Sequence, residues 1–181
     1  ALCLSVKDGK VLWQKKVAEV VRRAPNNSMA CPSPVTDGKR VYFLFGTGHL
    51  AAFDMDGNEV WARYLEADFG RFSVKWGYGT SPLLYDGKLY VQVVRREQPY
   101  EWSGEGEWPT DSFLLALDAD TGKDVWKQVR KPDGVDENQD AYSTPVLFQH
   151  GGRTEIVLAG GDCVTGHDPA TGQEVWRLGY N

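Results

Sequence analysis

The sequence has few cysteines and no paired ones. Cys3, Cys31 and Cys163 are odd in number and widely spaced, and none belongs to a Cys-x-x-Cys pair. Disulfide scaffolds and zinc sites both need clustered pairs, so the sequence predicts neither. We expect the three thiols to be small buried side chains.

Long apolar runs are also missing. No stretch approaches the ~20 apolar residues of a membrane-spanning helix, so we expect no transmembrane segment. There is no charged start followed by an apolar core, as a signal peptide would have. The chain begins at Ala1 rather than Met, which is compatible with an upstream leader or segment.

A surplus of positive charge is missing as well. The 20 Lys and Arg residues against 25 Asp and Glu residues give a net charge of −5, with no basic run. A surface that follows a phosphate backbone needs clustered Lys and Arg. We therefore expect no nucleic-acid partner, and anionic membranes are disfavoured for the same reason.

Catalytic and metal-binding patterns are missing too. His49, His150 and His167 stand at unrelated spacings, and no nucleophile elbow accompanies them. The Asp-rich turn at 118–124 differs from an EF-hand loop, because Gly122 occupies a ligand position and Val129 stands where the closing Glu should be. The sequence predicts no catalytic residue and no metal ligand.

Tryptophan is abundant, and four of the seven tryptophans share one frame. A glycine stands four positions before each of them, in Gly9–Trp13, Gly57–Trp61, Gly122–Trp126 and Gly172–Trp176. A second landmark precedes the last three, namely Ser33-Pro34, Ser81-Pro82 and Thr144-Pro145. Such a recurrence is typical of an array of one supersecondary unit.

Each unit contains four short apolar segments, A to D, separated by turns rich in Asp and Gly. Segment A follows the proline and segment D carries the tryptophan. Only 15–23 has a weak helical pattern, which we interpret as the end of a strand and a loop. Units of about 45 residues with four antiparallel strands predict an all-β fold, a β-propeller. We expect one propeller fragment of about three and a half blades: 1–32 (the end of one blade and a connection), 33–65, 81–130 (with an insertion at 95–112) and 144–181.

The stretch Ala116-Leu-Asp118-Ala-Asp-Thr-Gly122-Lys-Asp-Val-Trp126 resembles the tryptophan-docking motif, Ala-x-Asp-x3-Gly-x3-Trp, of the quinoprotein-type β-propellers, which are similar to pyrroloquinoline quinone (PQQ) enzymes. The other units match it in part. The resemblance implies that each Trp packs against the Gly of a neighbouring repeat, and that the Ala and Asp hold the corner between strands C and D. The structural residues implied are Trp13, Gly57, Trp61, Ala116, Asp118, Gly122, Trp126, Asp168, Gly172 and Trp176.

The resemblance leaves two functions open. Quinone-dependent dehydrogenases of the family hold PQQ with calcium, a catalytic Asp, a Trp platform and often adjacent cysteines, a set that cannot be mapped onto this sequence. Other members, such as the scaffolds of outer-membrane protein assembly, keep only the docking motif. We expect a non-catalytic scaffold without a cofactor, in a bacterial, extracytoplasmic and periplasmic setting. The alternative is part of a PQQ- and calcium-dependent alcohol or sugar dehydrogenase.

Loop lengths indicate where a binding site would lie. In an antiparallel meander, the long connections from D to the next A and the insertion at 95–112 emerge at the same end, here called the long-loop face. We expect a protein or small ligand to bind there. One candidate group is Trp102 and Trp108 in the insertion, unless that loop folds its aromatics over its neighbour. The other precedes each strand A, where side chains could simply solvate a wet channel: Asn26, Asn27, Lys75, Trp76, Tyr78, Asn138, Gln139 and Asp140.

The length predicts an incomplete ring. Seven or eight blades of about 45 residues need roughly 315 to 360 residues, whereas the chain has 181. A half ring leaves two blade faces bare. We expect either the rest of a longer chain or a second copy to complete it.

Overall fold

The structure, a computed structural model, describes residues 1–19, 27–96, 100 and 111–180 and arranges them in four antiparallel sheets. Sheet 1 is a hairpin of β1 (Leu2–Leu4) and β2 (Val11–Gln14). Sheets 2, 3 and 4 are four-stranded meanders in chain order. Sheet 2 consists of β3 (Val35–Thr36), β4 (Arg40–Leu44), β5 (His49–Asp54) and β6 (Glu59–Tyr64). Sheet 3 consists of β7 (Leu83–Tyr85), β8 (Lys88–Val93), β9 (Phe113–Asp118) and β10 (Asp124–Val129). Sheet 4 consists of β11 (Val146–His150), β12 (Arg153–Ala159), β13 (Cys163–His167) and β14 (Glu174–Gly179). The all-β, partial β-propeller architecture is confirmed.

Among the described residues, two short helices lie outside the sheets. The α-helix α1 (Leu65–Phe69) follows β6, and the 3-10 helix η2 (Asp136–Gln139) precedes β11. The sequence pattern predicts neither, because one turn of helix is too short to show a period of 3.6 residues. Residues 15–19 are not helical, as expected, and residues 20–23 lie outside the described residues.

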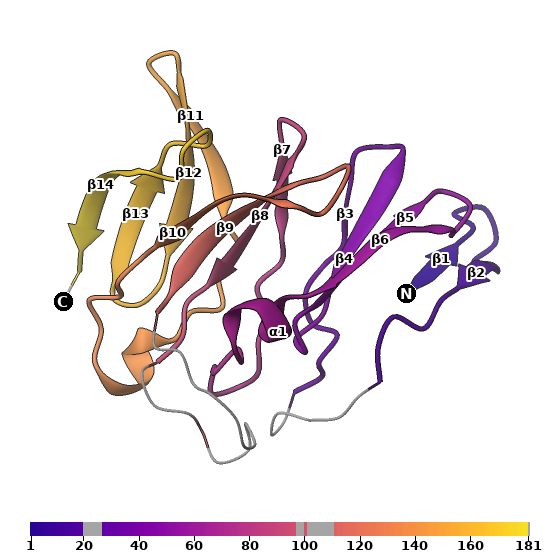
Figure 1. Cartoon of the computed structure of the whole chain (residues 1–181), viewed down its shortest axis with the longest axis horizontal. Coiled ribbons are helices and arrows are strands. Elements are labelled where there is room, and N and C mark those ends of the chain that lie inside the picture. Colours follow the sequence, from indigo (N-terminus) through magenta and orange to yellow (C-terminus); the bar gives the residue numbers. More distant parts are fainter. Residues whose placement is uncertain (20–26, 97–99, 101–110, 181) are drawn as a thin grey trace.

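The sheets stand side by side, with sheet 1 at one end of the array and sheet 4 at the other (Figure 1). The tight β3–β4, β7–β8 and β11–β12 turns emerge at one edge, and α1 and η2 lie at the opposite edge (Figure 1). The long-loop face is therefore one edge of the array.

The core consists of the layers between neighbouring sheets. Sheet 3 has a neighbour on both faces, which explains why β9 is buried from Phe113 to Leu117 with no alternation. Tyr42, Leu50 and Leu115 belong to the layer between sheets 2 and 3. Tyr90, Leu114, Ala116, Ile156 and Leu158 form the layer between sheets 3 and 4.

Tryptophans of strand D connect each sheet to the next. A Cβ atom built on Gly57 would lie 2.8 Å from the Trp13 ring, and one on Gly122 would lie 2.6 Å from the Trp61 ring. The Trp126 ring covers Gly172 in the same way, at 2.5 Å. These three glycines have φ of +83°, +69° and +77°, so glycine is needed both for the turn and for the close approach of the ring. The indole Nε1 atoms of Trp13 and Trp61 also donate to the neighbouring corner, at Met55 O (3.1 Å) and Ala119 O (3.0 Å).

The other two motif positions shape the corner itself. The residue directly opposite each tryptophan across strands C and D is small: Cys3, Ala52, Ala116 or Gly166. A small side chain there leaves room for the indole to lie on the sheet. Asp118 accepts hydrogen bonds from the backbone N–H (2.8 Å) and the hydroxyl (2.7 Å) of Thr121, and these hydrogen bonds lower the pKa of its carboxyl. Asp168 holds Thr171 in the same way, at 2.8 and 3.0 Å.

The Ser-Pro and Thr-Pro landmarks, just before strand A, make a second connection between neighbouring sheets. The backbone N–H of Ser33 donates to the hydroxyl of Ser81 at 2.8 Å, and the N–H of Ser81 donates to the hydroxyl of Thr144 at 3.2 Å. Proline then directs the chain into strand A in each repeat. The landmark therefore joins equivalent positions of three successive sheets.

The cysteines only partly follow expectation. Cys163 is fully buried, but Cys31 is exposed and Cys3 is half-buried. The prediction of three buried thiols is wrong for Cys31, which lies in the connection before β3 rather than in a strand.

Candidate functional site

Three equivalent connections meet on the long-loop face, one before each strand A. The side-chain Nδ2 of Asn27 donates to the carbonyl oxygen of Trp76 at 2.6 Å. The hydroxyl of Tyr142 accepts the backbone N–H of Trp76 at 3.2 Å. The backbone of Trp76 is thus held by one residue from the preceding connection and one from the following connection. We call Asn27, Trp76 and Tyr142 the Trp76 clasp.

The indole held by this clasp faces solvent. The Trp76 side chain is 42% exposed, and the Lys75 ammonium lies 5.1 Å from the centre of its ring. Lys75 also forms an ion pair with Glu137 of η2. A cation over the ring and a fixed backbone restrict the motion of an exposed aromatic, which is how interface anchors are preorganised.

The buried carboxylate of Asp140 holds the backbone of Lys75, the residue next to Trp76. Asp140 is only 7% exposed, and its Oδ2 atom accepts the N–H of Lys75 (2.8 Å) and the hydroxyl of Tyr100 (3.0 Å). Burial raises the pKa of Asp140, and it raises the pKa of Tyr142 to about 12. The Arg96 guanidinium lies 4.6 Å from the centre of the Tyr100 ring. The site thus combines an exposed apolar ring with a rim of both charges.

The structure brings some of the predicted site residues together and places others elsewhere. Asn27, Lys75, Trp76 and Asp140 are brought together by the hydrogen bonds above. Tyr78 is not at the surface: it is 2% exposed, belongs to the core, and donates its hydroxyl to Gln92 O at 2.7 Å. Asn138 and Gln139 lie in η2, where Asn138 is exposed and Gln139 half-buried. Asn26, Trp102 and Trp108 lie outside the described residues.

Two contributors were missed from the sequence. Tyr142 lies two positions beyond Asp140 in the same connection, and the residues predicted before this strand A end at Asp140. Glu137 belongs to no sequence motif, and only its ion pair with Lys75 in the structure shows that it contributes to the site.

The two described carboxylates beside the clasp, those of Glu137 and Asp140, are poorly suited to bind calcium. Calcium takes about 6 to 8 oxygen ligands, but Glu137 is paired with Lys75 and Asp140 Oδ2 already accepts two hydrogen bonds. The neighbouring ammonium would also repel a divalent cation. Within the described ranges, no three His, Cys, Asp or Glu side chains are close enough to share a metal. The described carboxylates beside the clasp, Glu137 and Asp140, therefore do not fit a calcium ion held with PQQ.

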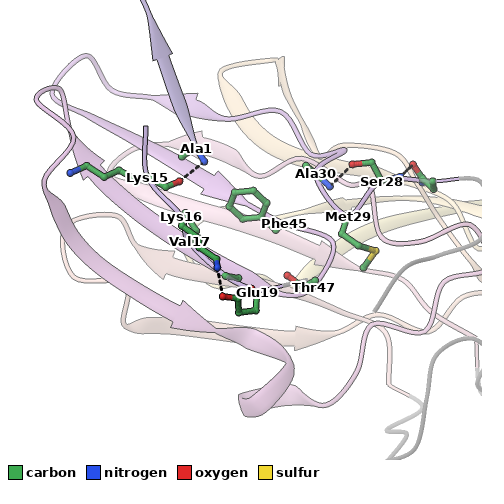
Figure 2. Close-up of a pocket in the computed structure, with 12 residues that line it drawn as sticks. Ala1, Lys15, Lys16, Val17, Glu19, Ser28, Met29, Ala30, Phe45 and Thr47 are labelled. Atoms are coloured by element: carbon green, nitrogen blue, oxygen red, sulfur yellow. Dashed lines mark hydrogen bonds and ion pairs between the residues drawn. The ribbon is translucent and has the colours of Figure 1, made fainter. Parts of the chain in front are cut away.

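A pocket of about 700 Å³ lies beside the clasp, between the segment after β2 and the connection before β3. Figure 2 shows Phe45 between these two walls, with Val17 on one side and Met29 on the other. Lys16 and Glu19 form an ion pair in the first wall, and Asn27 belongs to both the pocket and the clasp. The two walls are parts of the connection between β2 and β3, and Phe45 and Thr47 come from the turn between β4 and β5, so the sequence offers no signal for this pocket.

The fold and the seams between its sheets define a partial β-propeller of PQQ-like repeats. The family model described as outer membrane protein assembly factor BamB matches residues 2–180. The chain therefore belongs to this family of PQQ-like propeller-repeat proteins.

Solved structures show the same fold at low sequence identity. BamB from Moraxella catarrhalis is 18% identical with a TM-score of 0.57, over 93% of this chain and 40% of that one. Quinohemoprotein alcohol dehydrogenase ADHIIG from Pseudomonas putida HK5 is 17% identical with a TM-score of 0.62, over 98% of this chain and 31% of that one. A europium-containing methanol dehydrogenase is 15% identical with a TM-score of 0.60, over 97% of this chain and 37% of that one. The chain thus spans less than half the length of each. No curated protein sequence matched it.

In the described part of the chain, no helix has the length and apolar character needed to cross a bilayer.

Proposed function

We propose that this chain is a non-catalytic PQQ-like propeller unit that binds a protein partner on its long-loop face. The exposed ring of Trp76, whose backbone is held by Asn27 and Tyr142 from the preceding and following connections, is the observation that carries the proposal. A rigid aromatic with an apolar body is the residue type that dominates binding energy at protein interfaces.

The surroundings of Trp76 indicate the kind of partner. Lys75 over the ring and its partner Glu137 provide charges of both signs beside Trp76, which suits the polar rim of a protein interface. The pocket beside Asn27 could receive an apolar side chain next to the indole. A peptide segment with an apolar anchor and flanking charges of both signs fits these features.

Family membership supports an extracytoplasmic, periplasmic setting in a bacterium, since the matching family model is described by outer-membrane protein assembly. Part of a PQQ- and calcium-dependent dehydrogenase is the second candidate. It is favoured by the fold shared with the alcohol and methanol dehydrogenases.

The test is to select peptides from a displayed random library on the wild-type chain and to measure their affinity for variants. We expect Trp76→Ala to weaken the selected peptides about 30-fold, the loss typical of a hot-spot residue. Tyr180→Ala is the matched control, because this aromatic is 55% exposed but directly follows β14, in the sheet at the end of the array. Peptides that bind Trp76→Ala as tightly as the wild type would disprove the proposed site.

A further inference from the structure

Asp140 is a buried carboxylate that joins three connections of the long-loop face. It lies between β10 and β11, and its side chain is 7% exposed. Its Oδ2 atom accepts the backbone N–H of Lys75, from the connection before β7, at 2.8 Å. The same atom accepts the hydroxyl of Tyr100, from the segment between β8 and β9, at 3.0 Å. Since Lys75 directly precedes Trp76, this carboxylate fixes the backbone at the start of the segment that carries the exposed indole.

The fold opposes the ionisation of this carboxyl. Burial raises the pKa of Asp140, and the hydrogen bonds from Lys75 and Tyr100 and the charge of Arg96 offset this effect only in part. A raised pKa means that the carboxyl stabilises the fold most when protonated, and that this contribution is lost as the pH rises through its pKa. The structural Asp118 shows the opposite shift, because its hydrogen bonds lower its pKa. A carboxyl whose ionisation the fold opposes is typical of a functional position.

The charged and titratable groups around Asp140 come from all three connections. They are Lys75, Arg96, Tyr100, Asp136, Glu137 and Tyr142. The hydrogen bond from the Lys75 ammonium lowers the pKa of Glu137, so the carboxyls of Glu137 and Asp140 shift in opposite directions. Burial raises the pKa of Tyr142 to about 12, and it also raises that of Tyr100. Both hydroxyls therefore stay protonated in acid, where Asp140 gains its proton.

We propose that Asp140 is the positioning residue of the Trp76 site and that its ionisation controls the affinity for a peptide partner. The inference rests on the proposed function and adds the regulation of that site. As a carboxylate, Asp140 accepts strong hydrogen bonds from Lys75 and Tyr100, because hydrogen bonds to a charged group are the stronger ones. Protonation removes the charge and weakens both bonds. The segment that carries Trp76 is then less ordered before binding, and a partner must supply the cost of ordering it.

The affinity of selected peptides at pH 7.5 and at pH 4.5 tests the proposal. The peptides come from the displayed library, contain no Asp, Glu or His, and have blocked ends, so only the chain titrates. We expect the wild type to bind about 10-fold more weakly at pH 4.5. Asp140→Asn keeps an acceptor oxygen but cannot ionise. At both pH values it should bind about as the wild type does at pH 4.5.

Asp136→Asn is the matched control. It makes the same change at an exposed carboxyl of η2, where the residue has φ of +50°, a backbone conformation that Asn tolerates. The variant should keep the 10-fold dependence of affinity on pH, because Asp136 does not hold the backbone beside Trp76.

Tyr100→Phe separates positioning by Asp140 from a general effect of acid. The variant removes a hydrogen bond that lowers the pKa of Asp140, so the loss of affinity should begin at a higher pH than in the wild type. The amide signal of Lys75 in nuclear magnetic resonance spectra reports the same titration without any peptide. Its midpoint should agree with that of the affinity in both proteins, and Asp140→Asn should abolish the titration.

Two failures can be told apart. Equal wild-type affinity at the two pH values, or a loss that Asp140→Asn retains, would overturn this inference. The proposed binding site would stand as long as Trp76→Ala still weakens the peptides. Peptides that are insensitive to Trp76→Ala would overturn both the proposed function and the inference that rests on it.

Discussion

Single residues explain how a repeated motif becomes a repeated contact. A small residue opposite the tryptophan gives the ring room, the Asp side chain holds the turn, and the glycine receives the ring of the preceding sheet. The third seam, which is the contact between sheets 3 and 4, departs from this pattern. There, Pro169 O accepts the hydroxyl of Tyr90 at 3.0 Å, and the Trp126 Nε1 has no partner in the described structure. The aromatic burial, rather than the indole hydrogen bond, is therefore common to all three seams.

Replacing Trp61 by Ala should lower the free energy of unfolding by about 3 to 5 kcal/mol, as for other large-to-small changes at packed positions. The variant loses both the cover over Gly122 and the hydrogen bond to Ala119 O. Chemical denaturation measures the change. Trp76→Ala is the control and should cost less than about 1 kcal/mol, because its ring faces solvent. Equal losses in the two variants would contradict the docking role.

His167 should make stability depend on pH. It is fully buried, its Nδ1–H donates to Gly172 O at 2.9 Å, and its Nε2 lies 3.0 Å from the Thr165 hydroxyl, which also accepts Arg130 Nε–H at 2.8 Å. Burial, with Arg130 and Arg177 nearby, lowers the pKa of His167 below 6.5 despite the opposing effects of Gly172 O and Glu174.

As the pH falls below 6.5, the unfolded chain gains a proton at His167 before the folded chain does, so this contribution to stability is lost on acidification. We expect His167→Gln to show a smaller drop in melting temperature between pH 7.5 and 5.5 than the wild type. The exposed His150, changed to Gln, is the control and should leave that drop as it is. An unaltered drop in His167→Gln would show that this imidazole does not titrate as described.

Among the elements, the strands could be predicted from the sequence and the helices could not. Strands recur at the same distance from the Ser-Pro and Gly-x3-Trp landmarks, so each repeat supports the assignment of the others. Within the described residues, α1 has no α-helical counterpart in the other repeats, and its end is held by Arg95, which is distant in sequence. Near Trp76, the alternation of inward and outward side chains along an extended segment does not show which aromatic points inward. Gly77 has φ of +85° and redirects the chain between Trp76 and Tyr78.

Arg95 connects α1 to the base of the insertion. It is 2% exposed and donates to the carbonyls of Phe69 (3.2 Å), Arg71 (2.7 Å) and Asp111 (3.0 Å). Burial lowers the pKa of its guanidinium to about 10.

Arg95→Met should lower the free energy of unfolding by about 2 to 4 kcal/mol, because it leaves buried carbonyls without a donor. It should also increase hydrogen exchange at 65–72, as measured by mass spectrometry. Arg40→Met, which removes the ion pair with the exposed Asp120, should have a much smaller effect and leave that segment protected. Unchanged exchange at 65–72 in Arg95→Met would contradict the capping of α1.

At the scale of the whole molecule, the repeat in the sequence predicts the propeller architecture. The arrangement of side chains on the long-loop face depends instead on contacts between repeats. Asn27, Trp76 and Tyr142 are far apart in sequence, and only the curvature of the array brings them together. The described part of the chain is thus an array of packed sheets, with the Trp76 clasp at its long-loop edge.

A titration of the chain with PQQ in the presence of calcium decides between recognition and catalysis. Tryptophan fluorescence reports binding, and dye-linked oxidation of ethanol and glucose reports turnover. Because Glu137 is paired with Lys75 and Asp140 Oδ2 accepts hydrogen bonds from Lys75 N–H and the Tyr100 hydroxyl, we predict no saturable quenching and no reduction of the dye. Saturable binding accompanied by dye reduction would contradict a non-catalytic scaffold and assign the chain to a dehydrogenase.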